Sequence, residues 1–143
     1  MNLEILYLTF YSYFLGSIPF GLILTKFFLN KDLRDIGSGN IGATNVLRTG
    51  KKFLGALTLW LDALKAYVAL IVTYKYFIDY IYLSALLCFL GHIFPVWLSF
   101  KGGKGIAVFV GVLFALSISY GIIFVICWTV ILYLTKYSSI SSL

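Results

Sequence analysis

The chain has 143 residues, of which 62% are hydrophobic and 11% are charged, whereas a soluble domain carries about 25% charged residues. The mean hydropathy of +1.01 excludes a soluble globular protein, because no core of this size absorbs so much apolar surface and the natural solvent is a lipid bilayer. Lys and Arg outnumber Asp and Glu by 11 to 5, which gives a formal net charge of +6. In a membrane protein this charge first reports topology. Without an RNA-binding signature, zinc-finger spacing or a long basic run, it does not indicate a nucleic-acid partner.

Four apolar blocks follow one another along the chain, and together they predict about five transmembrane segments. The first, Leu3 to Phe28, is interrupted by GSIPFG at 16–21, where the proline is expected to kink or break the helix. Blocks 53–72 and 81–100 each have the ~20 residues that a spanning helix needs. The last, 106–134, is too long for one upright span and is expected to divide near 116–121. The predicted fold is all-α: a polytopic transmembrane helical bundle with short or broken helices, in a single domain over 1–143.

The sequence indicates neither redox chemistry at the cysteines nor a metal site. Cys88 and Cys127 lie within apolar segments, form no C-x-x-C pair, and are predicted to be reduced. With one His and five acidic residues, most of them isolated, the sequence predicts no metal site and no cofactor.

Basic residues gather in the connections on one predicted side of the membrane. That side holds eight of the eleven, namely Lys31, Arg34, Arg48, Lys51, Lys52, Lys101, Lys104 and Lys136. The other side holds Lys75 alone, while Lys26 and Lys65 lie within segments. By the positive-inside rule, both glycine-rich loops face the cytoplasm and the N-terminus lies outside.

The first glycine-rich loop, DIGSGNIGATNVLR at 35–48, matches G-x-G-x-x-G by coincidence. A dinucleotide-binding loop follows a buried parallel strand, whereas this one emerges from a membrane span. Its hydroxyls, amides and freed backbone still suit a phosphate, and a helical 44–48 would place Thr44, Asn45 and Arg48 on one face. The alternative is a flexible polar loop. The candidate residues are Ser38, Asn40, Gly42, Thr44, Asn45 and Arg48.

The second loop, KGGKG at 101–105, places two lysines around a flexible backbone just before a helix. It is not a Walker A motif, but glycine-freed amides and a lysine at a helix N-terminus form an anion site. The alternative is a basic juxtamembrane turn that serves only topology. Its candidate residues are Lys101, Gly102, Gly103 and Lys104.

Three ionisable residues are predicted inside the membrane. Asp62 and Lys65 have i, i+3 spacing, so they share a helix face and can neutralise each other. Whether this pair lines a substrate site or supports the scaffold is open from the sequence. His92, expected about two turns inside the cytoplasmic end of its helix, is either a hydrogen-bonded structural residue or a base.

In this order and context, SGNIGATNVLR, LDALKA and GHIFPVWLSFKGGKGIA resemble the bacterial membrane acyl-phosphate:glycerol-3-phosphate acyltransferases of the PlsY type. The resemblance covers nearly the whole chain. It implies transfer of a fatty acyl group from acyl-phosphate to the 1-hydroxyl of glycerol 3-phosphate, giving lysophosphatidic acid and phosphate, the first step of phospholipid synthesis. It also implies the bacterial cytoplasmic (inner) membrane, and a peripheral phosphate acyltransferase as the partner that makes the donor.

The resemblance assigns roles to individual residues. The expected catalytic residues are Ser38, Arg48, His92 and Lys104. The expected substrate- and phosphate-binding residues are Asn40, Gly42, Thr44, Asn45, Lys101, Gly102, Gly103, Ser138 and Ser139. Since the acyl-phosphate carbonyl is already activated, positioning and charge stabilisation are expected to do most of the catalysis, with a substrate phosphate ahead of His92 as the proton acceptor.

The resemblance stops at the C-terminus. Full-length family members have seven spans, and the last of these, together with a third cytoplasmic motif with His, Asn and Glu, would follow Leu143. The sequence is therefore expected to be a fragment or a truncated product, the latter with low activity or none. Two alternatives remain open: a small permease for a phosphorylated metabolite, and an inert membrane scaffold or inactive truncated remnant of the enzyme.

Overall fold

The structure, a computed structural model, describes residues 3–135, which form helices joined by loops and contain no β-strand. The first apolar block is two helices, α1 (Leu3–Ser17) and α2 (Phe20–Leu29), bent by 42° where Ile18 and Pro19 interrupt the helix. The predicted break is confirmed, because proline cannot continue the hydrogen-bond ladder of the preceding turn.

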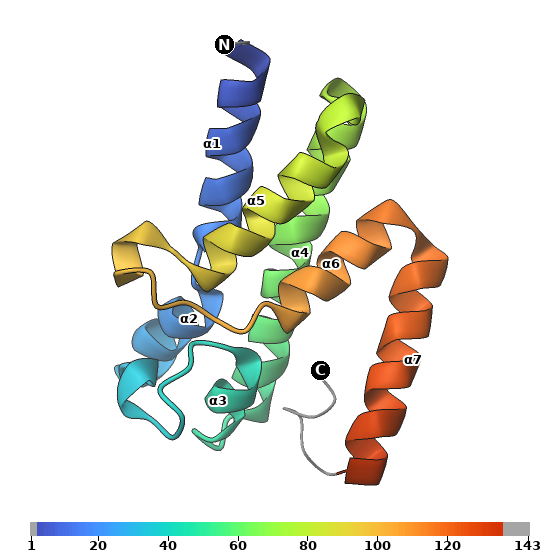
Figure 1. The fold of residues 1–143 in the computed structure, drawn as a ribbon. Helices are drawn as coiled ribbons and strands as arrows, with labels where there is room; N and C mark the ends of the chain where they lie inside the picture. The colour runs from blue at the N-terminus through green and yellow to red at the C-terminus, as the bar shows by residue number, and fades with distance from the viewer. Residues whose placement is uncertain (1–2, 136–143) are drawn as a thin grey trace.

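The other long helices follow the remaining apolar blocks (Figure 1). They are α4 (Lys52–Tyr76), α5 (Ile81–Ile93), α6 (Ile106–Leu116) and α7 (Ile118–Thr135). Short elements connect them: η1 (Leu33–Asp35), α3 (Ala43–Leu47), η2 (Ile78–Tyr80) and η3 (Val96–Leu98). In residues 3–135, three helical stretches are long and apolar enough to cross a membrane, and the bent α1–α2 pair can form a fourth span. The fourth predicted segment, α6, is apolar but only 11 residues long.

The third block ends earlier than the sequence indicates. A helix was expected over 81–100, but α5 ends at Ile93 and a loop with the short η3 follows. Pro95 explains the difference, because the residue before a proline is driven out of the helical region. His92 is consequently the second-last residue of α5, and the prediction that it lies two turns inside the helix is wrong.

Helices α1 and α5 cross at glycines, which lets their backbones approach closely. A methyl group on Gly16 would collide with the backbone carbonyl of Cys88, and one on Gly91 with that of Tyr13. Inside lipid the hydrophobic effect does not drive helices together, so close van der Waals packing at small residues stabilises such crossings. Hydroxyl hydrogen bonds add to this contact: Ser12 with Ser84 at 2.8 Å, and the Thr73 hydroxyl, which donates to Ser84 at 2.9 Å. Helices α1, α4 and α5 therefore form a polar-linked core.

Helices α6 and α7 stand to one side of this core (Figure 1). Gly111 of α6 packs directly on the backbone of Ala63 in α4, which makes α4 and α6 neighbours over much of their length. The predicted division of the last block is confirmed at Ser117, where the backbone is extended between α6 and α7. Very little of α7 is buried against the rest of the described chain.

Candidate functional site

The first loop is organised around the buried side chain of Asn45. Its Nδ2 group donates to the carbonyls of Leu33, Ile36 and Asn40 at 2.8–3.0 Å, and its Oδ1 accepts from the Ser38 amide at 3.1 Å. Since Asn45 is only 2% exposed, these bonds satisfy a buried amide and fix the path of the whole loop. The structure therefore shows Asn45 as the clamp of the loop.

This clamp leaves other side chains of the loop directed outward. The 44–48 stretch is helical as α3, as expected, but Asn45 faces inward, whereas Thr44 and Arg48 are exposed. The prediction that all three share one accessible face is therefore wrong. Ser38 is exposed in the turn, and the Arg48 side chain packs across neighbouring Gly37, where a methyl group would lie 2.7 Å from its Cδ.

Backbone turns complete the first loop. The Asn40 Oδ1 accepts a hydrogen bond from the Gly42 amide at 2.9 Å, a turn in which Asn closes the chain on itself. Gly37 has φ +54°, a conformation that a side chain disfavours. Asn40 and Gly42 therefore shape the loop from within.

The two arginines of this loop differ in their electrostatic environment. Arg34 forms an ion pair with Asp32 at 2.6 Å, and hydrogen bonds from its side chain and backbone lower the pKa of the Asp32 carboxyl to about 2. Within residues 3–135, the Arg48 guanidinium has no hydrogen bond or ion pair, and the Ser38 and Thr44 hydroxyls have no hydrogen bond. Arg48 is thus the arginine of this loop whose charge is free to meet a ligand.

The second loop has its glycine amides already occupied. Gly102 N–H donates to the Ile93 carbonyl at 2.9 Å and Gly103 N–H to the His92 carbonyl at 3.0 Å, so both cap the C-terminus of α5. Lys101 N–H donates to the Leu98 carbonyl. These amides are not available to a phosphate in this conformation, whereas the exposed side chains of Lys101 and Lys104 have no partner in the described part of the chain.

Beside this loop lies a buried ionic cluster. Lys65 Nζ lies 2.7 Å from Asp62 Oδ1, 2.6 Å from the Ile18 carbonyl and 3.0 Å from His92 Nδ1. The predicted neutralisation of Asp62 by Lys65 is confirmed. All three side chains are at most 4% exposed, and the His92 ring rests against Gly103, where a methyl group would collide with its Nε2.

Both loops lie toward the same end of the bundle, opposite the N-terminus and the turn between α4 and α5 (Figure 1). An apolar cluster lies under the first loop: Leu33, Ile41, Val46 and Leu54 are buried in it, and Leu98 of η3, which precedes the second loop, packs against it. The sequence placed these loops on one side of the membrane, but not in contact.

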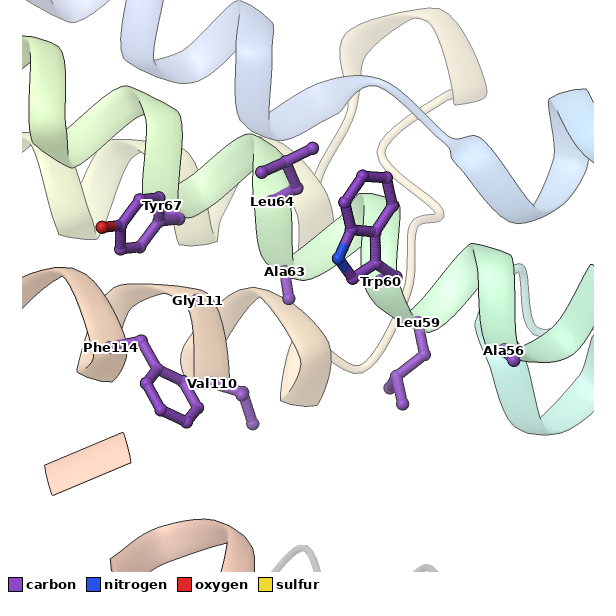
Figure 2. A pocket seen from close by; sticks show the side chains of 9 residues that line it. All are labelled: Ala56, Leu59, Trp60, Ala63, Leu64, Tyr67, Val110, Gly111 and Phe114. Carbon is purple, nitrogen blue, oxygen red and sulfur yellow. The ribbon is translucent and has the colours of Figure 1, made fainter. Parts of the chain in front are cut away.

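An apolar pocket of about 460 Å³ lies between α4 and α6 (Figure 2). Trp60 and Tyr67 of α4 and Phe114 of α6 are its aromatic lining residues, and Figure 2 shows them on the two neighbouring helices. The remaining lining residues are Ala56, Leu59, Ala63, Leu64, Val110 and Gly111. The volume falls within the ~300–1,000 Å³ of small-molecule sites. By helical spacing, the pocket residues of α4 lie on a different face of this helix from Asp62 and Lys65.

Several residues of these sites were not singled out in the sequence. The Ile18 carbonyl is one, although a proline break was a signal that backbone acceptors would be freed beside it. The pocket residues gave no signal, because any apolar helix face in a membrane protein looks the same. Ser138 and Ser139 lie outside the described residues. No group of three or more His, Cys, Asp or Glu that could hold a metal occurs in residues 3–135.

Comparisons with known proteins identify relatives of this chain. The family profile described as glycerol-3-phosphate acyltransferase matches residues 6–143. A glycerol-3-phosphate acyltransferase of Pelagibacter ubique (strain HTCC1062) is 57% identical over 141 residues, covering 99% of this chain and 74% of the relative. One from Wolbachia pipientis wMel is 50% identical, covering 92% of this chain and 70% of the relative.

Solved structures resemble the whole described fold. The crystal structure of PlsY (YgiH), an integral membrane glycerol 3-phosphate acyltransferase, in its glycerol 3-phosphate form has a TM-score of 0.88 and 41% identity, and the match covers 96% of this chain and 70% of that one. The lysophosphatidic acid form of the same protein has a TM-score of 0.86 and 40% identity.

Proposed function

Because the chain belongs to the glycerol-3-phosphate acyltransferase family, we propose that it takes its acyl group from an acyl-phosphate and transfers it to the 1-hydroxyl of glycerol 3-phosphate. The products are lysophosphatidic acid and phosphate. The chain is a multi-pass membrane protein, as its apolar helices and its integral membrane relative show. A peripheral phosphate acyltransferase would supply the donor, with both loops in the cytoplasm of a bacterium and the protein in its inner membrane.

One observation carries this proposal: unpaired cations extend from two loops that meet at one end of the bundle. The side chains of Arg48 and Lys104 have no partner within residues 3–135, whereas Arg34 is paired with Asp32. Two phosphates enter the reaction, one on each substrate, and a planar guanidinium together with an ammonium suits them. A permease requires no such convergence on a single membrane face.

The reaction needs little covalent help from the protein. The glycerol 3-phosphate hydroxyl oxygen attacks the acyl carbonyl carbon, and the bond from that carbon to the phosphate oxygen breaks. Arg48 and Lys104 stabilise the charge that develops on the leaving phosphate, and Ser38 donates to a phosphate or carbonyl oxygen. The hydroxyl proton passes to a substrate phosphate, because His92 Nδ1 already accepts a hydrogen bond from Lys65.

The remaining predicted site residues have supporting parts in this proposal. Asn45, Asn40 and Gly42 hold the first loop in shape, while Gly102 and Gly103 fix the second loop on the end of α5. Thr44 and Lys101 add a hydroxyl and a charge at the exposed face. No cofactor or metal takes part.

The apolar pocket is the proposed place for the acyl tail. Val110 lies four residues after Ile106, so the pocket begins about 6 Å along α6 from the end of the second loop. A tail lying between α4 and α6 would leave its phosphate near Lys104. Its predominantly apolar lining matches an alkyl chain.

The deciding experiment is turnover by the chain reconstituted in liposomes with acyl-phosphate and glycerol 3-phosphate, following both phosphate and lysophosphatidic acid. Arg48→Ala is expected to lower kcat by about 10²-fold, as loss of a preorganised charge donor does. Arg34→Ala is the matched control and is expected to stay close to the parent, because Asp32 already occupies that guanidinium.

The alternatives give different results in the same vesicles. Product formed only from acyl-coenzyme A or acyl carrier protein would overturn the proposed donor. Flux of glycerol 3-phosphate into the vesicles without product would favour the permease. A full-length relative, such as the Pelagibacter enzyme, shows in parallel that the assay detects turnover.

A further inference from the structure

Lys65 has every donor committed inside the protein. A lysine ammonium offers three N–H donors and no acceptor, and the three partners are Asp62 Oδ1, the Ile18 carbonyl and His92 Nδ1. The side chain is 2% exposed. Lys65 therefore has no free N–H donor for a substrate. Its role is to position the groups to which it is hydrogen-bonded.

The arrangement around His92 selects one form of its ring. Nδ1 faces the ammonium at 3.0 Å, so Nδ1 must act as the acceptor. The other oxygen in reach, Asp62 Oδ1, is 3.9 Å away, too far for a hydrogen bond from an Nδ1 proton. The single proton of the neutral ring is consequently on Nε2.

The Nε2 proton points to the second loop and has no partner there. Nε2 abuts Gly103, where a methyl group would collide with it, and it has no hydrogen bond within residues 3–135. Among the described residues that are not exposed, the only side-chain nitrogen or oxygen that is both fully buried and without a partner is Trp128 Nε1. His92 Nε2 has no partner, so it must retain some exposed surface. His92 is only 4% exposed.

We propose that Lys65 is a positioning residue, which holds His92 as the Nε2–H form so that this proton is offered to a phosphate oxygen beside Gly103. The proposal rests on the proposed function for the identity of the phosphate. Asp62 pairs with Lys65 at 2.7 Å, and the helix break at Ile18 supplies the carbonyl that fixes its position. His92 is then a hydrogen-bond donor in the reaction, and it does not act as the base.

The test exploits the fact that His92 is the only histidine of the chain. With ¹⁵N-histidine incorporated, the two ring nitrogens of the protein in nanodiscs report His92 alone, without any substrate. The parent is expected to show one form, with a protonated Nε2 and an unprotonated Nδ1. The Asp62→Asn/Lys65→Met double variant removes both charges together, and it is expected to show a mixture of forms.

The control is Lys75→Met, the same change at an exposed position of the same helix, and it is expected to keep the parent spectrum. A proton on Nδ1 in the parent overturns the proposal without any variant, so failure of the double variant to fold does not protect it. A folded double variant with an unchanged single Nε2–H form overturns the role of Lys65.

A kinetic comparison tests the donor role separately. His92→Gln keeps an N–H at the end of a side chain of similar reach, and it is expected to retain at least about a tenth of kcat, whereas His92→Leu is expected to lose about 10²-fold. Equal losses in the two variants would overturn the donor role. Absence of turnover in the parent would contradict the proposed function, while the ¹⁵N spectrum would still decide the ring form.

Discussion

Asn45 shows how one buried side chain organises a loop from within. Its amide group meets three backbone carbonyls and one backbone N–H, which no other residue type of similar size can do. The sequence marked it as a phosphate ligand because amides and hydroxyls stand side by side in the motif. The residue type indicated a side chain that forms several hydrogen bonds. The surrounding backbone determined that this side chain points into the loop.

We expect Asn45→Ala to destabilise the protein by about 1–3 kcal/mol, because three buried carbonyls lose their donor. Thermal unfolding in detergent measures this effect, and turnover is expected to fall with it. Thr44→Ala, the matched control at the exposed neighbouring position, is expected to leave the unfolding temperature unchanged. Equal behaviour of the two variants would contradict the clamp.

Helix α5 illustrates how a single proline changes the reading of an apolar block. The hydropathy of 81–100 is continuous, yet the helix stops at Ile93 and its last carbonyls receive the amides of Gly102 and Gly103. The glycine loop thus folds back onto the helix that precedes it. This places His92 at the meeting point of α5, α4 and the loop.

The contact between α4 and α6 leads to a test of the acyl-tail site. Leu59→Trp fills the pocket from its wall, so we expect turnover with long-chain acyl-phosphates to fall about tenfold or more while short-chain donors are affected less. Ile71→Trp is the control, a similarly exposed position of α4 outside the pocket. Chain-length preference in competition assays measures the effect, and a uniform loss for all donors would contradict this location.

Across the whole molecule, the connections that the charge distribution assigns to one side of the membrane also lie at one end of the helical bundle. The connections 30–52 and 101–105, which hold seven of the eleven Lys and Arg, lie at one end of the bundle, and the turn with Lys75 and Asp79 lies at the other (Figure 1). The direction of the bundle across the membrane is a prediction from the positive-inside rule.

Thiol labelling of intact cells tests this direction. In a background with Cys88→Ala and Cys127→Ala, a cysteine at Lys51→Cys is expected to react with a membrane-impermeant reagent only after the cells are opened. A cysteine at Asp79→Cys is expected to react from outside. Both positions are exposed, so access depends on the membrane alone. The reverse pattern would overturn the orientation.

The sequence by itself determined the all-helical membrane fold, the break at Pro19, the division at Ser117 and the pairing of Asp62 with Lys65. Each of these depends on local composition or on residue spacing along one helix, which a linear pattern records directly. The same is true of the family resemblance, because its motifs are continuous stretches of residues.

Only the tertiary structure decided which polar groups remain available. It turned Asn45 inward, committed the amides of Gly102 and Gly103 to the end of α5, and brought Lys65 against His92 from a different helix. The side chains of Arg48 and Lys104 stayed unpaired within residues 3–135 for the same reason. A hydrogen bond depends on where two distant groups meet and in which direction they point, and neither property is written in the order of residues.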